Sequence, residues 1–387
     1  MTALLRVVLD QVVAPTDPNL AMASRELTRA LVQSAPSGCE VEGIVPSAAG
    51  VAGAVEGAVP GLASLSRMAL PRRELAAAWQ LGVAPGVGGG MIHSPTLMAP
   101  LVRHDRLHDN DQTVVTLWDL DAWERPDEMP RGAVTWQKAM LKRAAKFADA
   151  VVVPTHAMAE RVGEIEPRLG DRVRVIAGAA PTGFAVPVDE IGRRRALKLP
   201  EGFVLVSGSS APSARLADAF AAAAQAGADL PVVVLDVPEG NEPAVVDLGV
   251  TAGFAEGRVH VQGVLEDADR GAVFGGAVVL LAPSVSLAFP WRVVEALAVG
   301  VPVVAMDSDA PREVLSDGGA LADSSASLSL GAEADTPVMS EALGHVLGQV
   351  LGSTAAVERY SILASDRGRA FSWAGAAERV WQLHADL

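Results

Sequence analysis

Residues 281–323 read LAPSVSLAFPWRVVEALAVGVPVVAMDSDAPREVLSDGGALAD, and this stretch decides the fold. Its runs of apolar and polar residues predict, in order, a strand, a loop, a helix, a second strand and a second loop. Pro283 and Ser284 end the first strand, and the helix contains VVEALAVG. A strand, a helical crossover and a second strand are the unit from which parallel α/β sheets are built.

Glu295 stands within this otherwise apolar helix. A carboxylate among buried aliphatic side chains needs a polar partner, or it faces a ligand. Helix N-termini in this setting also present free N–H groups to phosphate. We favour a ligand-facing glutamate. A surface glutamate on a helix with one polar stripe remains the alternative.

The same alternation continues on both sides of this stretch. Strands are predicted at 4–12, 39–46, 90–95, 113–119, 148–154, 171–177, 203–209, 231–236, 258–263, 277–284, 302–307 and 319–323. Helices are predicted at 19–35, 134–147, 155–164 and from Met339 onward, loops or short irregular helices at 47–70, a connection at 178–195 and a surface loop at 324–335. The near-continuous apolar strands are typical of parallel sheets covered on both faces. The sequence therefore predicts two doubly wound α/β domains with a cleft between them.

Composition excludes several classes of protein. The chain has 387 residues, of which 50% are hydrophobic and 20% charged, which argues against disorder. The single cysteine, Cys39, cannot build a disulfide framework and fits a reducing, cytoplasmic compartment. No run of about 18 apolar residues predicts a membrane span, and the first residues lack the pattern of a secretory signal. The net charge of −15 argues against nucleic-acid binding.

Common cofactor motifs do not occur at the expected positions. The turn after the first strand, VVAPTDPNLA, lacks glycine, and GVGGG at 86–90 precedes a strand, so a nicotinamide or flavin enzyme is disfavoured. Acidic triplets at 109–111, 119–121 and 307–309 are more readily turn residues and strand-end caps than metal ligands.

At residues 283–304 the sequence resembles the donor-binding signature of retaining glycosyltransferases of the GT-B fold, family four. The matching positions are Pro283, Ser284, Phe289, Glu295, Ala296, Ala298, Gly300, Pro302, Val303 and Val304. Further segments similar to the family are 114–130, 148–162, 173–184, 203–212 and 371–373, and Pro311 and Glu313 resemble a Pro-Glu pair that follows the signature.

The resemblance implies two Rossmann-like domains: an acceptor-side domain at 1–180, a nucleotide-sugar donor domain at 181–370, and a helix at 371–387 that crosses back onto the first domain. It implies transfer of a sugar from a nucleotide-sugar to a glycan or lipid-linked acceptor, as in cell-surface polysaccharide synthesis. Transfer would proceed with retention and without a metal or other cofactor. The donor phosphate itself would serve as the base in a front-side displacement, so that no protein nucleophile is required. The implied donor residues are Gly208, Ser209, Gly263, Ser284 and Phe289, with Arg215 and Arg292 at the diphosphate and Glu295 at the ribose. Trp118 and Asp119 would face the sugar or acceptor, and His93 would lie on the acceptor side.

Several family positions carry other residues in this chain. The first signature glutamate falls at Leu287, a histidine at Trp118, and a cationic pair at Ser213 and Ala214. These departures support a second hypothesis, a catalytically degenerate relative that binds a glycan or a partner glycosyltransferase. A third and less favoured hypothesis is a metal-dependent transferase that uses Asp119 and Asp121.

The segment 131–147 predicts a basic amphipathic helix with Lys138, Lys142 and Lys146 at i, i+4 spacing. One interpretation is peripheral contact with an anionic membrane or a lipid-linked acceptor. The favoured interpretation is an ordinary surface helix whose apolar stripe faces the core.

Overall fold

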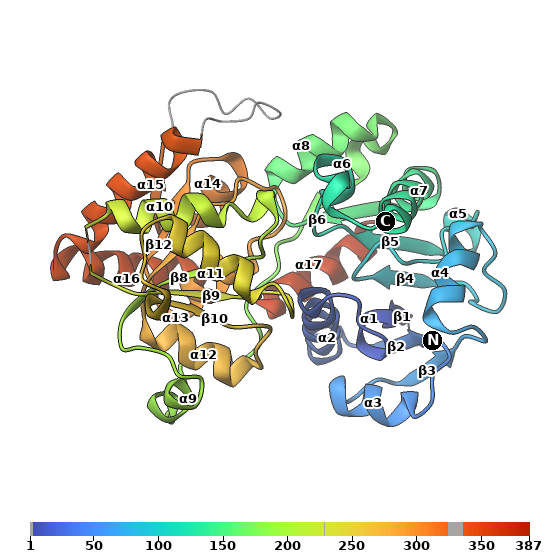
Figure 1. Cartoon of the computed structure of the whole chain (residues 1–387). Coiled ribbons are helices and arrows are strands. Elements are labelled where there is room, and N and C mark those ends of the chain that lie inside the picture. Colours follow the sequence, from blue (N-terminus) through green and yellow to red (C-terminus); the bar gives the residue numbers. More distant parts are fainter. Residues whose placement is uncertain (1–2, 228, 324–335) are drawn as a thin grey trace. The chain divides into compact units, whose positions relative to one another are not determined.

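The computed structural model describes residues 3–227, 229–323 and 336–387. It divides into two compact units, the first formed by Met1–Gly178 with Ser372–Leu387 and the second by Ala179–Phe371. The surface loop expected at 324–335 lies outside the described residues. Each unit is built around one parallel sheet flanked by helices (Figure 1).

The first unit has a seven-stranded parallel sheet in the order β3-β2-β1-β4-β5-β6-β7. Its strands are β1 (Ala3–Val8), β2 (Cys39–Val45), β3 (Ser64–Arg67), β4 (Met91–Ser94), β5 (Gln112–Thr116), β6 (Ala150–Val153) and β7 (Val173–Val175). Its helices are α1 (Asp10–Val13), α2 (Pro18–Gln33), α3 (Val51–Ala58), α4 (Arg72–Gln80), α5 (Arg106–Asp109), α6 (Asp121–Glu124), α7 (Arg131–Phe147), α8 (His156–Ile165) and α17 (Trp373–Asp386). The strand order reverses between β1 and β4, which is where doubly wound sheets bind ligands.

The second unit has a six-stranded parallel sheet in the order β10-β9-β8-β11-β12-β13. Its strands are β8 (Phe203–Ser207), β9 (Val232–Leu235), β10 (Val259–Val261), β11 (Ala277–Ala282), β12 (Val303–Met306) and β13 (Ala320–Ala322). Its helices are α9 (Glu190–Ala196), α10 (Leu216–Gln225), α11 (Glu242–Thr251), α12 (Asp267–Gly276), α13 (Trp291–Val299), α14 (Asp309–Leu315), α15 (Thr336–Leu351) and α16 (Thr354–Gly368). The predicted α/β class with two Rossmann-like sheets is confirmed, and the second sheet reverses its order between β8 and β11.

Three local predictions need correction. The strand predicted over 4–12 ends at Val8, and Asp10–Val13 form α1, because an apolar run alone does not distinguish a strand from a buried helix. Within 47–70 lies an edge strand, β3, which pairs with β2 although its sequence SLSR is polar. The predicted connection at 178–195 contains most of α9.

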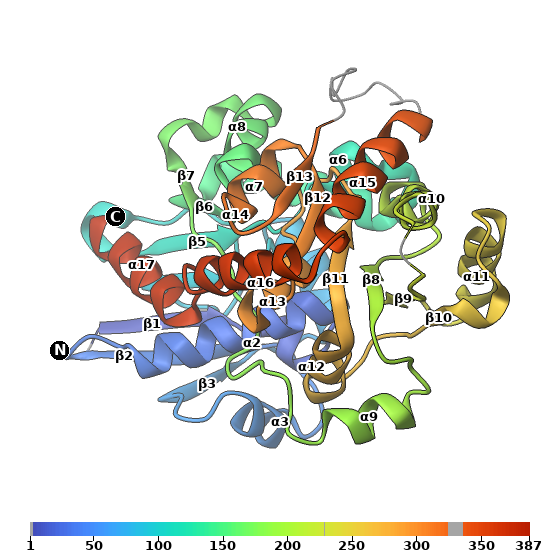
Figure 2. The ribbon, with the colours of Figure 1, turned by 90° about the vertical axis from the view of Figure 1, so that its left-hand side faces the viewer.

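The C-terminal helix α17 belongs to the first unit. It lies against α2 (Figure 2). The indole N–H of Trp381 donates to the carbonyl of Leu31 at 3.2 Å. The side chain of Gln112 on β5 donates to the carbonyl of His384 at 3.2 Å and pairs with its ring Nδ1 at 2.8 Å. The helix is therefore fixed to the sheet by buried polar contacts as well as by apolar packing.

Candidate functional site

A cavity of about 510 Å³ opens in the first unit, at the carboxyl ends of β4 and β5. Helices α4 and α7 and the segment after β1 complete its walls. Its lining includes Gln11, Thr16, Leu20, Arg72, Arg73, Gln80, Thr96, Leu97, Thr116, Leu117, Trp118, Asp119, Trp136 and Gln137. Polar groups at strand ends within an apolar enclosure are the usual composition of a small-ligand site.

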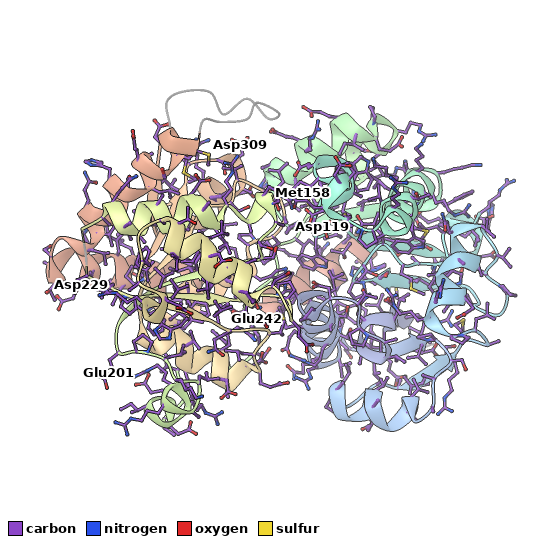
Figure 3. All side chains as sticks on the ribbon, viewed as in Figure 1. Asp119, Met158, Glu201, Asp229, Glu242 and Asp309 are labelled. Carbon is purple, nitrogen blue, oxygen red and sulfur yellow. The ribbon has the colours of Figure 1, made fainter. Side chains whose placement is uncertain are left out.

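Asp119 follows β5 and lines this cavity (labelled in Figure 3). Burial, followed by the nearby carboxylates of Asp121 and Asp17, raises its pKa to about 6 against the lowering effects of the Asp121 N–H and Arg125. The backbone N–H of Asp121 donates to Asp119 Oδ1 at 3.2 Å, while Arg125 pairs with Asp121. Asp119 is therefore a carboxyl group that titrates near neutral pH.

Replacing Asp119 by asparagine is expected to stabilise the chain at pH 8 by about 2 kcal/mol and to change little at pH 4. The pKa of Asp119 is 3.8 in the unfolded chain and about 6 in the folded chain. Ionised Asp119 therefore lowers the free energy of unfolding progressively as the pH rises from about 4 to about 6, and by a constant amount above that. Urea unfolding of both proteins at the two pH values measures this. An equal effect at both pH values would show that Asp119 does not have the raised pKa.

Trp118, predicted to face the sugar or acceptor, lines the same cavity but is held by its surroundings. Its indole N–H donates to the carbonyl of Pro95 at 2.8 Å, and its ring meets that of Trp373 edge-on at 6.4 Å between centroids. Because the N–H is already used, Trp118 offers a ligand only an apolar ring surface.

His93, predicted on the acceptor side, lies outside this cavity. It is fully buried on β4 with Nδ1 3.4 Å from Nε2 of His384, and its own Nε2 has no partner among the described residues. Burial lowers the pKa of His384 to about 4 and holds the pKa of His93 well below 6.5. The pair is neutral and joins β4 to α17.

Acid is expected to loosen this contact. Because the folded pKa of His384 lies below its unfolded value, stability is retained above about pH 6.5 and lost as the pH falls toward 4. We expect the chain to lose about 2 kcal/mol between pH 7 and pH 5 through His384. Urea unfolding should show that His384→Gln loses less stability between pH 7 and pH 5 than the unchanged chain. The exposed His108→Gln serves as the control, and an equal slope in all three proteins would refute the assignment.

In the second unit, Glu295 is bound by two arginines. Its carboxylate, 1% exposed, accepts from Nε of Arg270 at 3.0 and 3.1 Å and from Nη1 of Arg292 at 2.8 Å. Arg270 stands on α12 and also pairs with Asp267 at 2.7 Å. The sequence left open whether Glu295 meets a polar partner or a ligand, and the structure shows that it has protein partners.

Arg292, predicted at the diphosphate, is likewise engaged. Its Nε and Nη2 donate to the two carboxylate oxygens of Asp236 at 2.7 and 2.9 Å. Burial lowers the pKa of Arg292, but the charges of Glu295 and Asp236 outweigh burial and raise it. All three guanidinium nitrogens thus contact a carboxylate, and the two negative charges beside Arg292 already balance its own charge.

Arg215, the other predicted diphosphate contact, pairs with fewer carboxylates than Arg292 does. It stands just before α10 with φ of +50° and pairs with Asp218 through Nη1 at 3.3 Å. Among the described residues, nothing accepts a hydrogen bond from its Nε or Nη2. Arg215 is therefore better able than Arg292 to receive a phosphate.

The remaining predicted donor residues follow three different strands of the second sheet. Gly208 and Ser209 follow β8, and Ser284 follows β11, so they come from the two strands at the reversal of the sheet. Gly208 has φ of +145°, and a Cβ there would lie 2.9 Å from Cβ of Ala214, which excludes a side chain. Gly263 follows the outer strand β10, which β9 separates from β8.

Side-chain contacts already shape the loop after β11. The hydroxyl of Ser284 accepts from the N–H of Ser286 at 3.3 Å, and that of Ser209, after β8, accepts from Ala211 at 3.2 Å. Phe289 is buried and meets the ring of Trp291 edge-on at 4.7 Å, while Leu287 is 5% exposed. The residue in place of a family glutamate therefore packs as a core side chain.

Four residues at these sites were not predicted. Arg270 and Asp236 complete the cluster around Glu295, and Asp236 was detectable as an acidic residue ending a predicted strand. Arg72 and Arg73 line the cavity of the first unit from α4, a helix that was not predicted.

Two further expectations concern metals and membranes. No group of three His, Cys, Asp or Glu side chains in the described ranges is arranged to hold a metal ion. Within those ranges, no helix is long and apolar enough to cross a membrane. The apolar side chains Met140, Leu141 and Ala144 of α7 are buried, and Lys142 and Lys146 remain exposed. Membrane contact through this helix stays a prediction.

Comparisons with known proteins agree with this architecture. Residues 212–347 match the family model described as Glycosyl transferases group 1, which confirms the predicted resemblance for this part of the second unit. No curated protein sequence matches the chain significantly.

Solved glycosyltransferase structures share the fold along the whole chain. Sucrose-phosphate synthase from Thermosynechococcus elongatus is 17% identical with a TM-score of 0.69, covering 99% of this chain and 98% of that one. HepE of Anabaena in complex with UDP and glucose is 15% identical with a TM-score of 0.68 and full coverage of both chains, 100% each. WaaG, a glycosyltransferase involved in lipopolysaccharide biosynthesis, is 14% identical with a TM-score of 0.64, covering 97% and 98%. The chain therefore has the GT-B fold.

Proposed function

We propose that this chain transfers a sugar from a nucleotide-sugar donor to a glycan or lipid-linked acceptor, with retention and without a metal. The match of residues 212–347 to the group 1 glycosyl transferases carries the proposal. HepE structures that contain UDP and UDP-glucose support a uridine nucleotide as the first donor to test. A role in cell-surface polysaccharide synthesis is part of the same proposal.

The donor would bind at the carboxyl ends of β8 and β11. Gly208 allows a ligand to approach the backbone closely, and the N-terminus of α13 provides N–H groups for a phosphate. Arg215 is the proposed cation for the diphosphate, and the donor phosphate acts as the base in a front-side displacement. The cavity of the first unit, with Asp119 and Trp118 in its wall, would receive the acceptor.

The role proposed for Glu295 has to accommodate its two arginines. A carboxylate accepts about four hydrogen bonds, and Arg270 and Arg292 already supply three to Glu295. Because the carboxylate is also buried, a ribose hydroxyl could reach it only if these side chains moved. We propose that Glu295 acts mainly by fixing the first turns of α13 against α12, with Arg270 as the link.

Donor hydrolysis by the purified chain tests the proposal. UDP-, GDP- and dTDP-sugars are supplied separately, and nucleotide release is followed with and without EDTA. We expect release from one base class, unchanged by EDTA. Loss of release with EDTA would favour the metal-dependent alternative at Asp119 and Asp121 instead.

A second candidate is a degenerate, non-catalytic relative that binds a glycan or a partner glycosyltransferase. The engagement of all three guanidinium nitrogens of Arg292 and the burial of Leu287 favour it. This candidate predicts no release and no nucleotide binding. Turnover by the purified chain would exclude it.

A further inference from the structure

The cavity of the first unit has a cationic end that the proposed transfer does not use. Arg72 and Arg73 stand in the first turn of α4, and both line the cavity. Within the described part of the chain, no residue pairs with Arg73, and only Nε of Arg72 is engaged. The terminal nitrogens of Arg72 and the whole guanidinium of Arg73 are thus available to a ligand.

The guanidinium of Arg72 is fixed by a buried carboxylate. Its Nε donates at 2.9 Å to Oδ2 of Asp10, a fully buried carboxylate that also accepts from Nε2 of Gln11 at 3.0 Å. Gln11 in turn accepts from the N–H and hydroxyl of Thr16 at 2.9 and 3.1 Å. Because Asp10 balances only one positive charge, Arg73 leaves this end of the cavity cationic.

Another part of the lining suits hydroxyl groups. The hydroxyl of Thr116 and Oε1 of Gln137 are buried and have no hydrogen-bond partner among the described residues. Asp119 contributes a carboxyl group, and the charges that act on it most are those of Asp121, Asp17 and Arg125, not those of Arg72 or Arg73. This part of the cavity therefore offers hydrogen-bonding groups to a hydroxylated ligand.

We propose that this cavity binds a sugar that carries an oxyanion, either a phosphate or a carboxylate. The oxyanion pairs with Arg72 and Arg73, the sugar hydroxyls bond Thr116 and Gln137, and the ring of Trp136 packs on the apolar face of the sugar. A volume of about 510 Å³ accommodates a monosaccharide phosphate or a short anionic glycan. The inference rests on the proposed function only in taking this occupant to be the acceptor.

Calorimetric titration of the full chain tests this directly. The probes are glucose 6-phosphate, mannose 6-phosphate and glucuronate, with glucose and mannose as neutral counterparts and inorganic phosphate alone. We expect at least one anionic sugar to bind tenfold or more tightly than its neutral counterpart and than inorganic phosphate. Preference for a sugar phosphate or for glucuronate identifies the oxyanion. Equal affinity for charged and neutral sugars, or binding of none of them, would overturn the inference.

Variants separate the cationic end from the fold. Arg73→Ala, at an exposed side chain, should weaken the anionic sugar about tenfold and leave binding of its neutral counterpart unchanged. Arg103→Ala, also exposed in the first unit but outside the cavity lining, is the control. Unchanged affinity in Arg73→Ala would contradict the assignment. UDP titrated into the same samples reports the donor site, so the two proposals fail or succeed separately.

Discussion

Replacing Glu295 by leucine is expected to lower the free energy of unfolding by about 3 kcal/mol. The substitution leaves Arg270 and Arg292, whose side chains are 7% and 9% exposed, without the carboxylate between them. Asp236 and Asp267 still compensate part of the positive charge of the two arginines. The expected loss is therefore at the lower end of the roughly 3–5 kcal/mol found when one partner of a buried ion pair is removed. Urea unfolding at pH 7 measures the change.

Two further variants make this result specific. Glu341→Leu removes an exposed carboxylate from the same unit and should change stability by less than about 0.5 kcal/mol. Combining Glu295→Leu with Arg270→Met and Arg292→Leu removes the two buried guanidinium charges and should recover part of the loss, because the remaining carboxylates of Asp236 and Asp267 are 24% and 47% exposed. If Glu295→Leu unfolds at the urea concentration of the unchanged chain, the cluster does not support the fold.

Replacing Arg215 by alanine is expected to reduce donor turnover by about 10²–10³-fold. Arg215 is the predicted diphosphate contact that retains free guanidinium nitrogens in the described structure, whereas Arg292 is bound by two carboxylates. Loss of a cation that stabilises the leaving diphosphate lowers the rate of the chemical step. Nucleotide release from the donor that the unchanged chain accepts is the measurement.

Arg369→Ala provides the matched control, because this arginine lies in the same unit and its side chain is 79% exposed. It should leave turnover within about twofold of the unchanged chain. Circular dichroism and urea unfolding establish that both variants remain folded. Equal turnover in Arg215→Ala and Arg369→Ala would remove Arg215 from the donor site.

The sequence predicted the two sheets well, for a physical reason. Parallel strands covered on both faces require near-continuous apolar runs, and VVVL at 232–235 and AVVLLA at 277–282 are such runs. The edge strand β3 was missed because SLSR is covered less and needs no such run. The buried carboxylate of Asp10 meets Arg72, a contact across 62 positions that no local pattern reveals.

The sites were predicted less completely. The sequence indicated that Glu295 needs a polar partner or a ligand, but Arg270, on a different helix, could not be identified from spacing. The cationic end of the cavity depends on α4, whose first turn follows a Gly- and Ala-rich segment that predicts only irregular structure. Strand ends were the most informative positions, since Asp119, Ser209 and Ser284 end predicted strands and lie just after the observed ones.

Calorimetric titration of the intact chain with UDP, followed by GDP and dTDP, tests the central claim that this GT-B chain uses a nucleotide-sugar. We expect one saturable site for one of these nucleotides, with affinity reduced at least tenfold in Arg215→Ala and unchanged in Arg369→Ala. Absence of binding for all three nucleotides in a folded sample would contradict the account and support the degenerate relative instead.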